Sequence, residues 1–420
     1  MTPDTTRSRR GRRLTLALAA ALTCAFAAYT ASASPGHAAT TQAARLRQLV
    51  AQDVRAGAPG VIVRVDDGGG PVITIAEQAG WSRRDHVLTA ADRFRMGSNT
   101  KTMVATVVLQ LVAEHRLALT GSVESWLPGL VPDGRDITLR MLLNHTSGLF
   151  NYLNDPAVLR AFTGQDARVW APEEVLAAAV AHPPLFAPGT RYSYSNTNYL
   201  LLGLIAEKVT GEELADLVQQ RIAGPLHLRD TYLVTGADDR DNPTLAHGYE
   251  PDATRIGQLL PPGTSPGTAF VGPPRPEGYV DTTNVNLSTE WAAGAMVSSA
   301  RDWARFHTAL MSGRLLPPAE LQQMRTTVAE GPDTPNRSYG LGLEQVDTPC
   351  GTVWGHDGQV PGYSSEGYTD STGRRTVSVF AATIFGIADP TTSAAHKAVV
   401  NAAICAMLDK PVPTTETGPR

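Results

Sequence analysis

Ser98 and Lys101 are the residues whose types and spacing could do chemistry. Lys101 is the first of only four lysines in the 420-residue chain, and it follows Ser98 by three positions. A serine hydroxyl becomes an effective nucleophile when a base lies within hydrogen-bonding reach, and residues i and i+3 of a helix share one face. The two side chains would therefore meet if a helix begins near Gly97.

Apolar residues at helical spacing after Lys101 predict the helix that would hold this pair. They are Val104, Val107, Val108, Leu111 and Val112. A lysine buried beside them would have its charged form disfavoured, so it could act as a base. The S-x-x-K pattern is common by chance, however, and a surface lysine one turn from a hydroxyl is the alternative.

The composition indicates a soluble globular protein that does not bind nucleic acid. The chain has 42% hydrophobic residues, 18% charged residues and a net charge of −4, which is an ordinary globular balance. Nothing beyond the N-terminus is strongly basic. The ten histidines form no H-E-x-x-H motif and the cysteines lack metal-site spacing, so we predict no metal and no cofactor.

The N-terminus predicts a cleaved export signal over residues 1–39. Arginines cluster between residues 7 and 13, residues 14–28 are apolar, and small residues follow. We expect cleavage within residues 33–39, a secreted mature protein and no stable membrane anchor. A transmembrane anchor is the alternative, but the apolar run falls short of the roughly 20 residues that span a bilayer. Lipid attachment at Cys24 fits poorly after Leu22 and Thr23.

Loss of the signal leaves Cys350 and Cys405 as the two cysteines of the mature chain. In an oxidising compartment two such cysteines are expected to pair. The loop between them has 54 residues, for which chain entropy gives a stabilisation of about 4 kcal/mol. Two buried free thiols are the alternative.

Strand patterns lie near both ends of the chain, and helical patterns fill much of the rest. Strands are predicted at residues 61–67, 72–76, 352–356, 363–369 and 375–382, and helices at 173–180, 199–209, 300–310 and 393–408. Residues 232–285 are expected to form long loops. We predict one domain over residues 40–410, with an α/β part (about 45–118 and 290–410), a helical and loop insertion (about 119–289) and a disordered tail (411–420).

Residues 263–267 match G-x-S-x-G, the motif of another class of serine hydrolases. That motif uses the backbone N–H of the residue after the serine. Here this residue is Pro266, which has no N–H. We therefore predict a loop, and Ser98 rather than Ser265 as the nucleophile.

Three motifs in order resemble the signature of the serine β-lactamase and DD-peptidase family. They are Ser98-x-x-Lys101, Tyr194-x-Asn196 and His356-Asp357-Gly358. The Tyr-x-Asn form resembles the class C β-lactamase branch and the secreted D-alanyl-D-alanine carboxypeptidases of Streptomyces. Residues 140–149, 292–296 and 339–343 are also similar to that branch. The resemblance covers about residues 45–408 and implies an α/β fold with an antiparallel sheet flanked by helices and a mostly helical inserted region.

The resemblance also implies an acyl-enzyme mechanism. Ser98 would attack a carbonyl, Lys101 and Tyr194 would carry its proton, and the lysine charge would lower the pKa of Tyr194. Asn196 would bind the acyl group. The N–H groups of Ser98 and Gln359 would bind the oxyanion.

The remaining implied substrate-binding residues lie on the strand of the third motif. They are His356, Asp357 and Gly358, and the glycine would let substrate approach the strand closely. Asp357 departs from the family, which has a hydroxyl there that holds the substrate carboxylate. If residues 339–343 and Cys350 set the register, Glu344 stands where the Streptomyces carboxypeptidases have a carboxylate-binding arginine. Both departures put cleavage at a free C-terminal D-alanine in doubt.

The function expected first is that of a D-alanyl-D-alanine carboxypeptidase-like peptidase. The alternatives are a D-amino-acid amidase or aminopeptidase, an esterase, a β-lactamase, and a non-catalytic receptor for penicillin or cell-wall fragments. The expected partner is a small peptide or cell-wall-derived substrate, with β-lactams as a further possibility.

Overall fold

A computed structural model describes residues 35–235, 242–259, 269–384, 386 and 389–411. Most of the predicted export signal, the 263–267 motif and all but the first residue of the predicted tail lie outside the described residues. Among the helices of the described part, none has the length and apolar character that crossing a bilayer requires.

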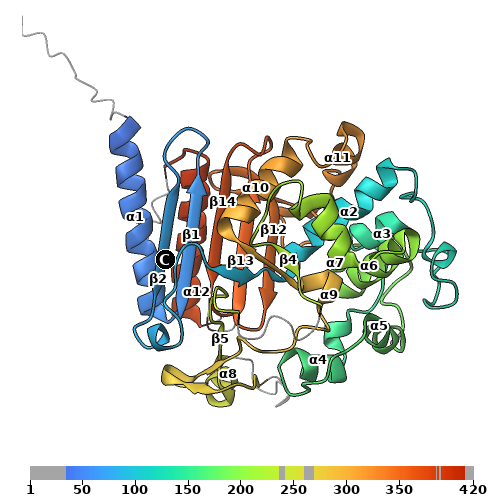
Figure 1. The fold of residues 1–420 in the computed structure, drawn as a ribbon, viewed down its shortest axis with the longest axis horizontal. Coiled ribbons are helices and arrows are strands. Elements are labelled where there is room, and N and C mark those ends of the chain that lie inside the picture. The colour runs from blue at the N-terminus through green and yellow to red at the C-terminus, as the bar shows by residue number, and fades with distance from the viewer. Residues whose placement is uncertain (1–34, 236–241, 260–268, 385, 387–388, 412–420) are drawn as a thin grey trace, which may run out of the picture.

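An antiparallel sheet of eight strands runs through the centre of the molecule (Figure 1). Its strand order is β2-β1-β14-β13-β12-β11-β10-β9. The bounds are β1 Gly60–Asp66, β2 Ile73–Gln78, β9 Val328–Ala329, β10 Arg337–Tyr339, β11 Glu344–Thr348, β12 Gly351–Val360, β13 Tyr363–Thr369 and β14 Thr376–Ala381. β1 pairs with β14, with Val63 opposite Val379. The two ends of the described chain therefore build one sheet.

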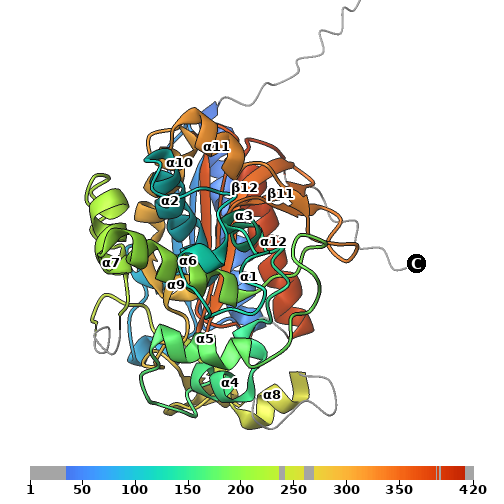
Figure 2. The ribbon, with the colours of Figure 1, turned by 90° about the vertical axis from the view of Figure 1, so that its right-hand side faces the viewer.

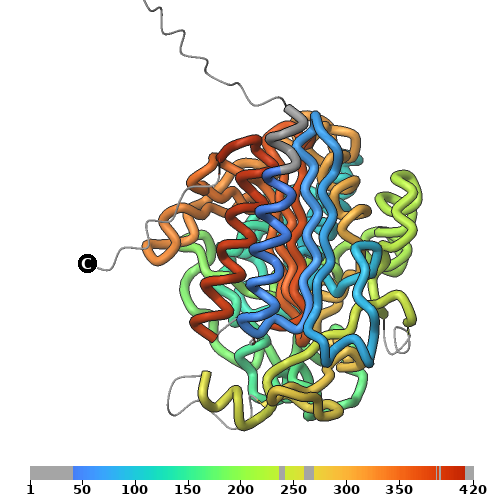
Figure 3. Tube along the Cα trace, turned by 90° about the vertical axis from the view of Figure 1, so that its left-hand side faces the viewer, coloured from blue at the N-terminus to red at the C-terminus, as the bar shows by residue number. Residues whose placement is uncertain are grey.

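Two helices from opposite ends of the chain cover one face of this sheet. α1 (Pro35–Ala56) and α12 (Pro390–Met407) run side by side over it, as Figure 3 shows. The core between these helices and the sheet is aliphatic, with Val61, Val377, Val399 and Met407 among its fully buried residues. Burial of such side chains is the main force that holds the layer on the sheet.

The other face carries the larger core and the helical part of the chain (Figure 2). α10 (Ala300–Met311) packs on β13 and β14, and α2 (Thr100–Ala113) packs against α6 (Asn196–Thr210) and α9 (Trp291–Gly294). The remaining helices of this side are α3 Leu139–Leu143, α4 Pro156–Phe162, α5 Pro172–Val180, α7 Leu214–Val218 and α11 Pro318–Met324. The helices predicted at 173–180, 199–209, 300–310 and 393–408 are confirmed as α5, α6, α10 and α12.

Residues 232–285 hold more structure than the predicted loops. β4 (Tyr232–Leu233) joins β3 (Arg93–Arg95) and β8 (Met296–Ser299) in a small sheet. A second small sheet contains β5 Tyr249–Pro251, β6 Pro274–Arg275 and β7 Tyr279–Asp281, and α8 (Ala253–Leu259) follows β5. The loop prediction was wrong here because strands of two or three residues are too short to show an alternating pattern.

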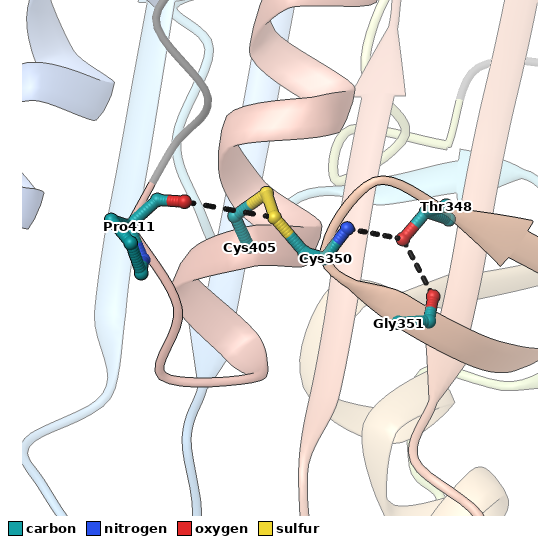
Figure 4. Close-up of a disulfide and its surroundings, with 5 residues drawn as sticks. All are labelled: Thr348, Cys350, Gly351, Cys405 and Pro411. Carbon is teal, nitrogen blue, oxygen red and sulfur yellow. Dashed lines mark hydrogen bonds between the residues drawn. A yellow bond between two sulfur atoms is a disulfide. The ribbon is translucent and has the colours of Figure 1, made fainter.

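The predicted disulfide is present. Cys405, near the end of α12, is bonded to Cys350 in the turn between β11 and β12, with 5.2 Å between the two Cα atoms (Figure 4). The bond ties the covering helix to the hairpin that carries the third motif. It therefore restrains the end of the chain against the strand β12.

Replacing both cysteines with alanine is expected to lower the free energy of unfolding by about 4 kcal/mol, because the unfolded chain regains the entropy of an open loop. Guanidinium denaturation of the oxidised protein and of the double variant measures this difference. A reducing agent should lower wild-type stability to that of the variant and leave the variant unchanged. Equal stability of the variant and the oxidised wild type would contradict the prediction.

Candidate active site

The predicted serine–lysine pair is formed at the start of α2. Ser98 lies in a 3₁₀ turn over Gly97–Asn99 that leads directly into the helix. The Lys101 ammonium donates to Ser98 Oγ at 3.0 Å. Ser98 is partly exposed, whereas Lys101 is fully buried. The Ser98 hydroxyl is thus accessible from solvent, whereas Lys101 is shielded from it.

Two glycines let β12 pack against the turn that carries Ser98. Gly97 has a φ of +50°, a left-handed conformation that glycine adopts readily, and a Cβ there would collide with the backbone nitrogen of Gln359. A Cβ on Gly358 would collide with the carbonyl of Met96. Gly358 therefore makes room for the protein's own backbone, rather than for substrate as the sequence suggested. The Gln359 nitrogen lies beside the Ser98 turn, where an oxyanion donor is needed.

Burial lowers the pKa of Lys101 to about 7, although the charges of Glu290, Asp357 and Glu344 act in the opposite direction. The same ammonium donates to the carbonyl of Ala293 at 2.7 Å. A neutral amine is therefore available near neutral pH to accept the Ser98 proton, as a general base must.

Tyr194 lies next to this pair but differs from the expectation in its ionisation. The Lys101 Nζ atom is 5.0 Å from the centroid of the Tyr194 ring. Burial raises the pKa of Tyr194 well above its usual value, while a hydrogen bond with Ser98 lowers it. The pKa of Tyr194 is thus raised by burial, not lowered by the lysine charge as expected. Tyr194 is therefore a protonated phenol near neutral pH, which leaves Lys101 as the candidate base.

His145 holds the segment that carries Tyr194. Its Nδ1 accepts from the backbone N–H of Ser195 at 3.2 Å and from Asn198 Nδ2 at 2.9 Å, and its ring centroid is 4.2 Å from that of Tyr194. Burial lowers the pKa of His145 well below its usual value, so the ring is neutral. These contacts make His145 a residue that stabilises the turn before α6.

Asn196 opens α6 two residues after Tyr194. It is 4% exposed, and its backbone N–H donates to Asn151 Oδ1 at 3.2 Å. Its own Oδ1 has no hydrogen-bond partner among the described residues. A buried acceptor of this kind needs a donor, which a substrate amide could provide. Its role in binding the acyl group stays a prediction.

His356 is more deeply buried than a substrate-binding residue should be. It is fully buried on β12, with Nε2 2.8 Å from the Tyr339 hydroxyl and Nδ1 in contact with the Asp357 carbonyl. Burial lowers the pKa of His356 to about 4, so the ring is neutral. The sequence placed His356 among the substrate-binding residues. The structure instead makes it a strand residue whose two nitrogens are engaged by the protein.

Arg337 of β10 pairs with the acidic residues on and beside β12. The sequence analysis did not identify this arginine. Its guanidinium contacts the Glu344 carboxylate, and it lies 3.1 Å from Asp357 Oδ2 and 3.6 Å from Glu330 Oε2. Glu344 is 3% exposed. It lies under Arg337 and does not line the neighbouring cavity. The prediction that Glu344 faces substrate is therefore corrected.

Asp357 does face open space. Its side chain is 40% exposed. With Gln359 it lines a cavity of about 540 Å³ between β11, β13 and α12. Ser98, Lys101 and Tyr194 do not line this cavity, which lies on the α12 face of the sheet, and it is the backbone of Gln359 that borders the Ser98 turn. The far wall includes Lys397 and His396 of α12.

Two groups of described residues bring three possible metal-ligand atoms within 4.8 Å of one another. They are Asp85 with His247 and Asp281, and Glu344 with His356 and Asp357. In each group one arginine already pairs with both acidic residues. Arg275 contacts Asp85 at 2.7 Å and Asp281 at 2.9 Å, and Arg337 plays the same part in the second group. The guanidinium supplies the positive charge that a metal would otherwise bring.

The sequence analysis missed two charged residues of the site. Each lies just before a stretch of sequence that supports the family resemblance. Glu290 precedes residues 292–296, and Arg337 precedes residues 339–343. A charged residue at the margin of an otherwise apolar or glycine-rich stretch is the signal that could have found them.

The similarity to proteins of known structure matches this geometry. A D-stereospecific amidohydrolase from Streptomyces sp. is 36% identical, with a TM-score of 0.71 over 86% of this chain and 98% of that chain. A D-amino acid amidase from Ochrobactrum anthropi SV3 is 26% identical, with a TM-score of 0.71 over the same shares.

Esterase EstB from Burkholderia gladioli is 38% identical over 157 residues, which are 35% of this chain and 40% of EstB. The similarity thus spans well under two thirds of that esterase. Residues 46–401 match the family described as Beta-lactamase, and the match includes every residue of the three motifs. The chain therefore belongs to the beta-lactamase family and is a serine hydrolase.

Proposed function

We propose that the protein hydrolyses amides of D-amino acids and of short D-peptides through an acyl-enzyme on Ser98. The observation that carries the proposal is the exposed carboxylate of Asp357, whose charge acts on Lys101 and which lies two residues before Gln359 on the strand that borders the Ser98 turn. The stereochemistry rests on the names of the two similar structures, a D-stereospecific amidohydrolase and a D-amino acid amidase.

The surroundings of Asp357 are poorly suited to a leaving group with a free carboxylate. Asp357 presents its carboxylate to the cavity on the α12 face of the sheet, and the one positive charge of Arg337 is shared with Asp357, Glu344 and Glu330. Two unit charges about 4 Å apart interact by roughly 4 kcal/mol at an effective dielectric of about 20. A neutral amide or ammonia as leaving group avoids this repulsion.

A carboxypeptidase, the function expected first from the sequence, remains the second candidate because of Lys397. This lysine is exposed and lies on the far wall of the cavity. It could bind the carboxylate of a longer leaving group. Its neighbour His396 pairs with Asp53 at 2.8 Å and lies 3.5 Å from Glu366, so its charge is already matched.

The wild-type protein is expected to prefer the C-terminal amide of a D-alanyl-D-alanine peptide over the free acid by at least about tenfold in kcat/KM, even when solvent screens most of the repulsion. Asp357→Asn should reduce that preference, since it removes the exposed carboxylate and keeps the side-chain shape. Steady-state kinetics on the two peptides gives the ratio.

Asp347→Asn provides the matched control, because Asp347 lines the same cavity on β11 but does not pair with Arg337. The control should leave the ratio near that of wild type. A wild-type preference for the free acid, lost in Lys397→Ala, would refute the amidase proposal and support the carboxypeptidase. D-Alanine amide and its L-enantiomer, tested side by side, examine the stereochemistry separately.

A further inference from the structure

Glu290 is a buried carboxylate to which the chemistry described above gives no role. It precedes α9, is 3% exposed, and its Oε1 has no hydrogen-bond partner among the described residues. A buried carboxylate without hydrogen bonds is costly unless a positive charge lies nearby. Such a residue therefore needs an explanation.

The α9 turn connects Glu290 to the catalytic lysine. The backbone carbonyl of Glu290 accepts from the N–H groups of Ala293 at 2.7 Å and Gly294 at 3.0 Å, and the Ala293 carbonyl accepts from Lys101 Nζ at 2.7 Å. A Cβ on Gly294 would lie 2.7 Å from Glu290 Oε2. The carboxylate thus folds back over the same short turn that holds the ammonium.

The backbone of this turn is strained. Trp291, the residue after Glu290, has a φ of +27°, which is unfavourable for a side chain of its size. Strain of this kind persists where the surrounding structure imposes it, and it is concentrated at functional sites. Gly203 of α6 makes room for this conformation, since a Cβ there would lie within 2.9 Å of the Trp291 ring.

The other charges around Lys101 are already balanced. Asp357 and Glu344 act on Lys101 but both pair with Arg337. By contrast, burial raises the pKa of Glu290 to about 7, and Lys101 is the cation that acts in the opposite direction. The remaining titratable groups that face Lys101 or Glu290 are uncharged near neutral pH, and they are His145, Tyr152, Tyr194, Tyr199 and His356.

We propose that Glu290 is a positioning residue that acts through Lys101 as the counter-ion of the ammonium formed during acylation. In that step the Ser98 oxygen bonds to the substrate carbonyl carbon, and the Ser98 proton moves to Lys101. The ammonium then returns the proton through Tyr194 to the leaving amine as the carbon–nitrogen bond breaks. Protonation of the lysine favours the charged form of Glu290, which in turn stabilises the ammonium. The proposal rests on acyl transfer at Ser98 and not on the choice of substrate.

Glu290→Gln is expected to lower the pKa of Lys101, since the mutation removes a negative charge that favours the ammonium. The acid limb of the acylation rate should move to lower pH by at least about half a unit. Its plateau should fall by up to about threefold for each half unit, because a weaker base accepts the proton less readily. The probe is p-nitrophenyl acetate, whose leaving group needs no proton, so that the rate reports acylation alone.

Direct titration provides a readout that does not depend on activity. With only four lysines in the chain, the Lys101 signal of lysine-labelled protein can be assigned by NMR and followed with pH in the Ser98→Ala background. Adding Glu290→Gln should move the titration of Lys101 to lower pH. An unchanged or higher pKa of Lys101 in a folded variant would overturn the proposal.

Two further variants separate the charge of Glu290 from its packing. Glu290→Asp keeps the charge and should keep most of the wild-type pH profile, which also covers the case in which the glutamine variant does not fold. Glu207→Gln is the matched control, since burial also raises the pKa of Glu207 but its charge does not act on Lys101. A shift of the acid limb in Glu207→Gln equal to that in Glu290→Gln would overturn the specific role.

Discussion

Ser98→Ala is expected to lower kcat by at least about 10⁴-fold on any ester or amide that the protein hydrolyses, because no acyl-enzyme can form. The residual rate would come from binding and from the backbone donors beside the turn. Ser98 is the partly exposed serine to which Lys101 donates. Hydrolysis of D-phenylalanine amide measures the loss, and mass spectrometry detects the missing acyl-enzyme.

The fold should survive this change, since alanine fits wherever the serine side chain fits. Ser265→Ala is the control, because Ser265 belongs to the G-x-S-x-G sequence that Pro266 makes unsuitable. The control should acylate at the wild-type rate. Loss of acylation in Ser265→Ala together with normal acylation in Ser98→Ala would mean that the wrong serine has been assigned.

Lys101→Arg is expected to slow acylation by at least about a hundredfold, the lower range for a general base. Arginine keeps the positive charge beside Ser98 and Tyr194, but it does not lose its proton near neutral pH. Wild-type Lys101 differs because burial lowers its pKa to about 7. Single-turnover kinetics with p-nitrophenyl acetate measures the acylation step.

Lys208→Arg serves as the control for this substitution, since Lys208 is an exposed lysine in the last turn of α6. It should have no effect on acylation. Circular dichroism and the unfolding midpoint show whether the buried arginine disturbs the helix. A well-folded Lys101→Arg protein with a rate close to wild type would exclude the lysine as base and leave Tyr194 as the remaining candidate.

The buried surroundings of Ser98 explain how one lysine can serve both halves of the reaction. Burial favours the neutral amine, and the nearby carboxylates favour the ammonium. The two opposing effects place the pKa of Lys101 at about 7. Near that pH the amine accepts and returns a proton with similar ease. Tyr194, whose pKa burial raises, stays protonated in the resting protein and can serve as a relay.

Much of the candidate site could be predicted from the sequence because its central contact is local. Ser98 and Lys101 are three residues apart, so a helix alone brings them together. The end of α6 is local in the same way, since Gly211 adopts a φ of +77°, a left-handed conformation that commonly ends a helix. The cysteine pair followed from counting, since the predicted mature chain has two cysteines. The export signal rests on sequence alone and stays a prediction.

Only the tertiary structure decided how charges far apart in the sequence are matched. Arg337, Glu344 and Asp357 lie on three adjacent strands, and their contacts depend on the register in which β10, β11 and β12 pair. No local pattern records that register. The fate of Glu344, which the sequence placed against substrate and the structure buries under Arg337, is a consequence.

Burial was likewise decided only by the packing of distant segments. Gly358 packs against the backbone carbonyl of Met96. Glu290 lies in the same turn as Ala293, whose carbonyl accepts a hydrogen bond from Lys101. Whether a polar residue faces substrate, solvent or another buried charge depends on which elements cover it. Hydrophobic periodicity indicates only which face of an element is buried, and not what covers that face. The sequence by itself therefore determined the family resemblance and the pairing of Ser98 with Lys101, whereas the fold determined the electrostatic environment of that pair.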